Sequence, residues 1–172
     1  MTRRNHTRKF RPNHTPDLDR RLAPGEITVP TLSRLLDAAA IDHDVHHDGE
    51  AVLVTAFAIN VMLHPHPEAG TLAIRSICEF AEGSDPEAAL GFVNACNVES
   101  AMVQFALVGE PLRLGGYHVL WTTDGLLPRQ IIRAASRFAG GFRGAVAEAV
   151  SARLMTLPWI DEPVRPCAGL VH

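Results

Sequence analysis

Residues 84–108 read SDPEAALGFVNACNVESAMVQFALV, and this stretch decides the fold because it joins a helix directly to a strand. Asp85 is suited to cap the helix, since its carboxylate can accept hydrogen bonds from first-turn amides, and Pro86 suits the first helical position. Asn97 is suited to end the helix as a left-handed cap. An apolar stripe at helical spacing predicts one buried face and consists of Ala89, Leu90, Phe92 and Val93.

From residue 101 onwards the period of the apolar pattern changes to two. Alternation of this kind predicts a strand with at least one buried face. The two alternating sets are Ala101, Val103, Phe105 and Leu107 on one side, and Met102, Gln104, Ala106 and Val108 on the other.

Length and charge divide the chain into one domain and two tails. The chain has 172 residues, of which 47% are hydrophobic, so one domain with a sizeable core is expected. The net charge of -3 conceals an asymmetry: residues 1–26 hold seven Arg or Lys against three Asp or Glu, and the remainder holds nine against sixteen. Residues 1–26 also lack apolar periodicity, which predicts a disordered basic tail. We expect an α+β domain over residues 27–156 and an irregular tail over 157–172.

Cysteine usage and hydropathy favour a cytoplasmic protein. Cys78, Cys96 and Cys167 are an odd number without CxxC spacing, and no secretory leader is recognisable, which predicts reduced thiols. The longest apolar run, residues 51–63, is too short for a membrane helix, which needs about 20 residues. We therefore expect no membrane association.

Before residue 84 the pattern predicts one helix and three strands. An amphipathic helix is expected from Thr28 or Thr31 to Ile41, followed by a short strand over residues 42–47. The pair Asp48-Gly49 predicts a reversal of the chain. The run 51–63 suits one long strand or two strands joined by a bulge, and residues 71–80 alternate as a further strand.

After residue 108 the pattern predicts one strand and one long helix. Residues 117–123 alternate, and helical spacing of apolar residues continues from Pro128 to Leu154. Gly140-Gly141 within this helix marks either a break or a close approach of another segment. The order α-β-β-β-α-β-β-α predicts an α+β fold with an antiparallel sheet of about five strands.

Five motifs together resemble the YbjN family of small bacterial proteins, whose fold is similar to that of type III secretion chaperones. The motifs are TLSRLLDAA, HHDGEAVLV, DPEAALGFVNACN, AMVQFAL and GLLPRQIIRAASRF, which lie within residues 28–154. The family pattern places an asparagine pair where this chain has Asn94 and Asn97. The resemblance implies an α+β domain that often self-associates, with a binding or regulatory role and no established chemistry.

Four histidines form the alternative of a metal site. His64 and His66 point to one face of a strand, and His46 and His47 lie at the end of another. Together with Asp44 or Asp48 they could bind zinc or nickel if the two strand ends are neighbours. No HExxH or CxxC motif accompanies them, so exposed histidines at strand ends are the simpler interpretation.

No catalytic group emerges from the remaining residues. Cys96 is expected near the negative end of a helix dipole, which opposes thiolate formation. Arg129, Arg133 and Arg137 recur every four residues and form a basic stripe, which could meet an acidic partner or simply face water. Asn94 and Asn97 could tie the helix to a neighbouring loop or read the backbone of a partner, and the structural role is favoured.

We interpret the chain as a non-catalytic, chaperone-like module that binds a protein or peptide client, acts as a cytoplasmic homodimer and needs no cofactor. Its alternatives are a metal-binding protein that uses the histidines, and a nucleic-acid-associated protein that uses the basic arm. The candidate partner-binding residues are Asn94, Asn97, Met62, Met102, Trp121, Arg129, Arg133 and Arg137.

Overall fold

The structure is a computed structural model that describes residues 18–156. Its helices are α1 (Val29–Ala38), α2 (Pro86–Glu99) and α3 (Pro128–Ser151), with 3-10 turns at Pro24–Glu26 and Pro67–Ala69. Its strands are β1 (His43–Val45), β2 (Val52–Val54), β3 (Val61–His66), β4 (Thr71–Glu79), β5 (Gln104–Val108) and β6 (Arg113–Trp121). The expected α+β class is confirmed.

The strands form one antiparallel sheet in the order β1-β2-β3-β4-β6-β5. β4 and β6 pair over nine residues, from Thr71 opposite Trp121 to Glu79 opposite Arg113, and form the longest ladder of the sheet. β5 pairs only with β6 and is therefore an edge strand.

The sheet has six strands rather than about five, because the apolar run 51–63 folds into two strands joined by a turn instead of a bulge. β2 ends at Val54, and the amide of Thr55 then donates to the carbonyl of Asp42 at 3.0 Å. Ala58 adopts a left-handed backbone with φ of 60°. The chain reverses there, and β3 returns beside β2 with Val54 opposite Val61.

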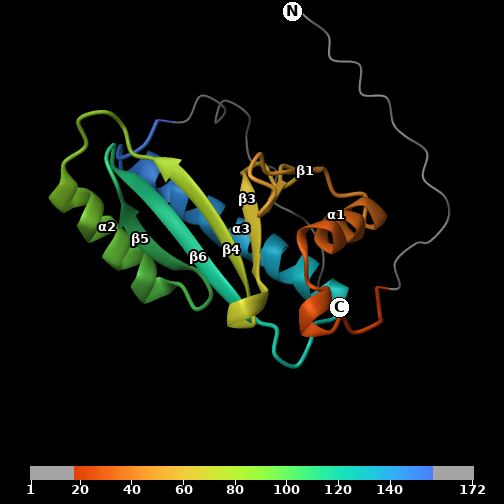
Figure 1. The fold of residues 1–172 in the computed structure, drawn as a ribbon. Coiled ribbons are helices and arrows are strands. Elements are labelled where there is room, and N and C mark those ends of the chain that lie inside the picture. The colour runs from red at the N-terminus through yellow and green to blue at the C-terminus, as the bar shows by residue number, and fades with distance from the viewer. Residues whose placement is uncertain (1–17, 157–172) are drawn as a thin grey trace, which may run out of the picture.

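The core lies between the sheet and α3, which runs behind the central strands in Figure 1. Phe138 and Phe142 of α3 stack with ring centroids 6.0 Å apart. They pack against Gly116 of β6, where an added Cβ would overlap the Phe142 ring and stand 3.3 Å from Cζ of Phe138. Absence of a side chain at this position lets the helix approach the sheet closely. We call this side of the sheet the helix side and the other the open face.

The other two helices lie at opposite edges of the sheet, α2 beside β5 and α1 beside β1 (Figure 1).

Asp85 caps α2 as expected, since its carboxylate accepts from the amides of Glu87 and Ala88 at 3.3 Å. The expectation for Asn97 was wrong, because α2 continues to Glu99 and Ser100 ends it with an extended backbone. The two following strands also differ in extent: β5 begins at residue 104 rather than 101, and β6 spans 113–121 rather than 117–123.

Two further segments differ from or refine the sequence-based expectations. Residues 18–26, which the sequence assigned to the basic tail, include Leu22, which is buried and pairs with Leu126. The remainder of that tail and residues 157–172 lie outside the described part of the chain. α3 is continuous through Gly140-Gly141, and a Cβ on Gly141 would lie 3.2 Å from Val103, so the pair marks a close approach and not a break.

Replacing Gly116 by Ala should lower the free energy of unfolding by about 1–3 kcal/mol, because a rigid aromatic ring occupies the space of the new methyl group. Gly140→Ala is the matched control, since nothing lies within 4 Å of a Cβ there. That variant should raise the free energy of unfolding by about 0.5–1 kcal/mol. Urea denaturation measures both values, and equal effects of the two substitutions would contradict the placement of α3.

Candidate binding site on the open sheet face

The open face of the sheet carries rows of side chains that cross the strands. Because side chains alternate along each strand, residues opposite one another in the ladder share a face. One row runs through Leu53, Met62, Arg75 and Tyr117, which are successive partners from β2 to β6. The next row contains Ile77 of β4 beside Gly115 and Ala106, so it has one large apolar side chain and two small positions.

The open face is hollowed into a groove of about 750 Å³, which we call the sheet groove. Its apolar lining includes Leu53, Met62, Ile77, Val108 and Tyr117. Gly115 and Ala106 add little side-chain volume to the middle of the groove, because neither has a side chain larger than a methyl group. Ile77 is 52% exposed, and Val108 is 36% exposed. The groove is therefore an apolar surface that the three helices leave uncovered.

The charge of the sheet groove is one-sided. Arg75 lies in the middle of its long row, with its guanidinium carbon 5.2 Å from the centroid of the Tyr117 ring, which is within cation-π range. No Asp or Glu is among the described residues that line the groove. A cation beside apolar surface and without a lining carboxylate favours a ligand that combines apolar and negatively charged groups.

A second cavity, of about 830 Å³, lies where β5 begins, and we call it the edge hollow. Met102, Val119 and Trp121 supply apolar lining, and Asn97 and Ser100 supply polar groups from the end of α2. Trp121 is 70% exposed. The edge hollow is more polar than the sheet groove.

Asn97 has a structural role at the edge of the sheet. Its side-chain amide donates to the carbonyl of Phe105 at 2.9 Å and accepts from the amide of Phe105 at 2.7 Å. One side chain therefore satisfies both outward-facing backbone groups of an edge-strand residue, which stabilises the contact between α2 and β5. Asn94, one turn earlier, is exposed. The favoured interpretation of Asn97 as a tie to a neighbouring segment agrees with this geometry.

The basic stripe lies apart from both cavities. Arg129, Arg133 and Arg137 are exposed on α3, whose buried face packs on the helix side of the sheet. Arg129 forms an ion pair with Asp19, which brings the segment before Leu22 onto this helix. The stripe is thus separated from the sheet groove by the thickness of the domain, and its role in binding stays a prediction.

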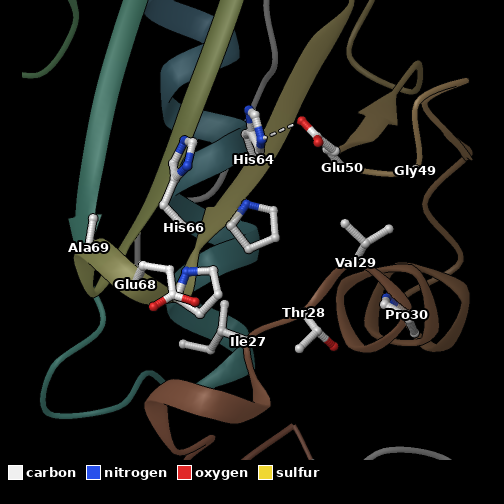
Figure 2. A pocket seen from close by; sticks show the side chains of 12 residues that line it. Ile27, Thr28, Val29, Pro30, Gly49, Glu50, His64, His66, Glu68 and Ala69 are labelled. Carbon is white, nitrogen blue, oxygen red and sulfur yellow. Dashed lines mark ion pairs between the residues drawn. The ribbon is translucent and has the colours of Figure 1, made fainter.

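The four histidines form two pairs. The rings of His46 and His47 lie 4.1 Å apart, and those of His64 and His66 lie 4.2 Å apart. His64 and His66 line a third cavity, of about 520 Å³, between β3 and the start of α1, where Nε2 of His64 points toward Glu50 at 3.9 Å (Figure 2). Among residues 18–156, no three His, Cys, Asp or Glu side chains form a group that could hold a metal ion. The geometry gives no support to the metal alternative.

Burial shifts the pKa values of one histidine and two cysteines. Desolvation lowers the pKa of His64, and the positive charges of His66 and Arg75 lower it further. Desolvation also raises the pKa values of Cys78 and Cys96, so both thiols stay protonated and weakly nucleophilic near neutral pH.

The structure divides the predicted partner-binding residues among several surfaces. Met62 lies in the sheet groove, whereas Met102 and Trp121 lie together in the edge hollow with Asn97. Sequence reasoning did not single out Arg75, Ile77 or Tyr117. A signal existed for Ile77, because it is a large apolar residue at an outward position of an alternating strand.

Comparison with known proteins identifies the fold. No protein-family pattern and no curated protein sequence matches the chain. Among solved structures, it is similar to YbjN from E. coli, a candidate transcription regulator, with a TM-score of 0.63 and 16% sequence identity over 74% of this chain and 94% of that chain. It is also similar to the HopA1-SchA chaperone-effector complex, with a TM-score of 0.49 and 11% identity over 66% and 88% of the two chains. The chain has a YbjN-like fold, as expected. The described residues contain no helix that is long and apolar enough to cross a membrane.

Replacing Asn97 by Ala should lower the free energy of unfolding by about 1–3 kcal/mol, because both backbone groups of Phe105 lose their partner. Asn94→Ala removes the same side chain from an exposed position of the same helix and should change the value by less than about 0.5 kcal/mol. Urea denaturation separates the two outcomes. Equal losses would show that Asn97 does not hold the edge of the sheet.

His64 should titrate below its usual pKa of 6.5 in a histidine-resolved NMR titration of the folded protein. Because the unfolded chain then binds the proton first, the free energy of unfolding should fall as the pH drops from about 6.5 to the folded pKa. His64→Gln should reduce this slope within that window. A titration midpoint at or above 6.5 would show that burial does not govern this residue.

Proposed function

We propose that the chain is a non-catalytic protein-binding module whose sheet groove holds an apolar segment of a client protein. The observation that carries this proposal is the uncovered apolar groove on the open face, in which Ile77 is half exposed. Large exposed apolar surfaces on soluble domains mark interaction sites, because they gain free energy when a partner removes them from water. Burying one side chain of this size contributes about 1.5–3 kcal/mol.

The client segment carries a carboxylate beside its apolar residues. Arg75 is the charged residue of the groove lining, and its flat guanidinium is held over the Tyr117 ring. A carboxylate placed there would gain a charge-assisted hydrogen bond in a partly dry site, which is worth about 1.5–3 kcal/mol. A basic client segment would be repelled. The charge of Arg75 thus favours apolar segments that carry a carboxylate over apolar segments that carry a basic group.

We propose no reaction, because the described thiols are weakly nucleophilic near neutral pH. Both described cysteines have raised pKa values, and of the four histidines only His46 lines the sheet groove. Residues 1–17 of the basic arm that would bind nucleic acid lie outside the described residues. The expectation of a cytoplasmic homodimer stays a prediction, which light scattering of the full chain can measure.

Peptides selected from a displayed library against the full chain should combine large apolar residues with Asp or Glu. Fluorescence anisotropy should show that Ile77→Asp weakens their binding by about tenfold or more, since it places a carboxylate in the groove beside the carboxylate of the bound peptide. Arg75→Gln should weaken the acidic peptides and leave their amidated forms, with Asn and Gln in place of Asp and Glu, nearly unchanged.

Val98→Asp is the matched control, because Val98 is 87% exposed on α2 and does not line the groove. This variant introduces the same charge and should retain wild-type affinity. Thermal unfolding confirms that each variant is folded before binding is compared. If Ile77→Asp and Val98→Asp bind the selected peptides equally well, the groove is not the client site.

A further inference from the structure

The ladder between β5 and β6 ends before β6 does. The last pair at this end is Gln104 with Tyr117, whereas β6 continues to Trp121. The chain before Gln104 leaves the plane of the sheet, because the carbonyl of Met102 lies 2.9 Å from Nδ1 of His118. His118 is opposite the buried Ile74 and therefore points to the helix side. Among the described residues, the final part of β6 thus has no neighbouring strand on the β5 side.

The register fixes which backbone groups are exposed there. The amide of Thr122 donates to the carbonyl of Gly70, so even-numbered residues of β6 direct their backbone groups toward β4. Odd-numbered residues direct theirs toward β5, and beyond Tyr117 these are Val119 and Trp121. Within residues 18–156 no backbone segment pairs with these two residues on that side. Two amides and two carbonyls therefore face the edge hollow.

The lining of the edge hollow defines the chemistry of a strand that could occupy it. Val119 and Trp121 stand on the open face, and Trp121 is 70% exposed. His118, Asn97 and Ser100 lie at the margin toward the helices. No Asp, Glu, Lys or Arg is among the described residues that line the hollow. A charged segment would find no counter-charge, whereas an uncharged one would bury apolar surface and pair its backbone.

We propose that the free end of β6 is a second binding site, which takes an uncharged extended peptide segment of a partner protein as an added strand in line with β5. Residues opposite one another in a hydrogen-bonded pair share a face. The apolar residues of the segment therefore lie beside Val119 and Trp121 and direct their amides to β6, while small polar residues alternate with them. Tyr117 lines both cavities, but this site rests on the backbone groups of Val119 and Trp121, whereas the groove rests on Ile77 and Arg75, so separate variants can test each site.

Amide hydrogen exchange of the full chain tests the site. In the free protein, Val119 and Trp121 should exchange faster than His118 and Leu120, whose amides face β4. The probes are the end-blocked peptides Thr-Val-Thr-Val-Thr and Ser-Tyr-Ser-Ile-Ser. Either peptide at saturation should slow exchange at Val119 and Trp121 by about tenfold or more and leave Ile77 unchanged.

Two N-methylated versions of the first peptide separate backbone pairing from side-chain contact. N-methylation of the two valines removes the amides that face β6 and should weaken binding by about tenfold or more, since each lost hydrogen bond contributes about 1 kcal/mol. N-methylation of the threonines modifies the opposite edge and should change binding by less than about threefold. Trp121→Asp should weaken both peptides, and the groove variant Ile77→Asp should bind them as the wild type does.

Several results would overturn this site. Slow exchange at Val119 and Trp121 in the dilute free protein would mean that the chain covers its own edge. If exchange at these two residues slows as the protein concentration rises without added peptide, a second copy of the chain covers the edge. Failure of both peptides to slow exchange, equal binding of the two N-methylated versions, or loss of binding in Ile77→Asp would each exclude an added strand at β6.

Discussion

The packing of Phe138 and Phe142 against Gly116 is the contact on which the remaining structure depends. It places the longest helix directly on the strands β3, β4 and β6, and the core forms between the helix and these strands. The shorter helices then lie at the sheet edges, beside β5 and β1. Because each of the three described helices lies on one side or at an edge of the sheet, none of them covers the opposite face. The sheet groove is a consequence of this arrangement.

Local patterns in the sequence predicted most of the elements, and tertiary contacts decided what they could not. The Asp85-Pro86 start of α2 and the alternation of β4 depend on neighbouring residues, so both were predictable. The division of residues 51–63 was not, because an apolar run looks the same whether it is one strand or two. The turn at Ala58 forms where Thr55 reaches Asp42, a contact that no local pattern contains.

The candidate sites were predictable only in part for the same reason. Met62 and Trp121 were found because a large apolar residue at an outward strand position is visible in the sequence. The contact between Arg75 and Tyr117 was not predictable, because it depends on the strand register, which places the two residues opposite each other on neighbouring strands. Asn97 was expected to hold the helix to a neighbouring segment, but which segment could not be predicted, because Phe105 lies eight residues further along the chain. Side-chain pairing across elements is decided by packing and not by spacing.

The edge hollow follows from the direct connection between α2 and β5. α2 packs at the edge of the sheet toward the helix side, so the chain needs residues 100–103 to rise into the plane of the strands before pairing can begin at Gln104. β6 has no such constraint, because β4 pairs with it as far as Trp121. β6 therefore extends beyond the start of β5, and the last backbone groups of β6 on that side have no partner within residues 18–156. A longer linker could lead the chain back along β6 and close that edge, whereas this short one cannot. The same stretch that decides the fold thereby also creates its open edge.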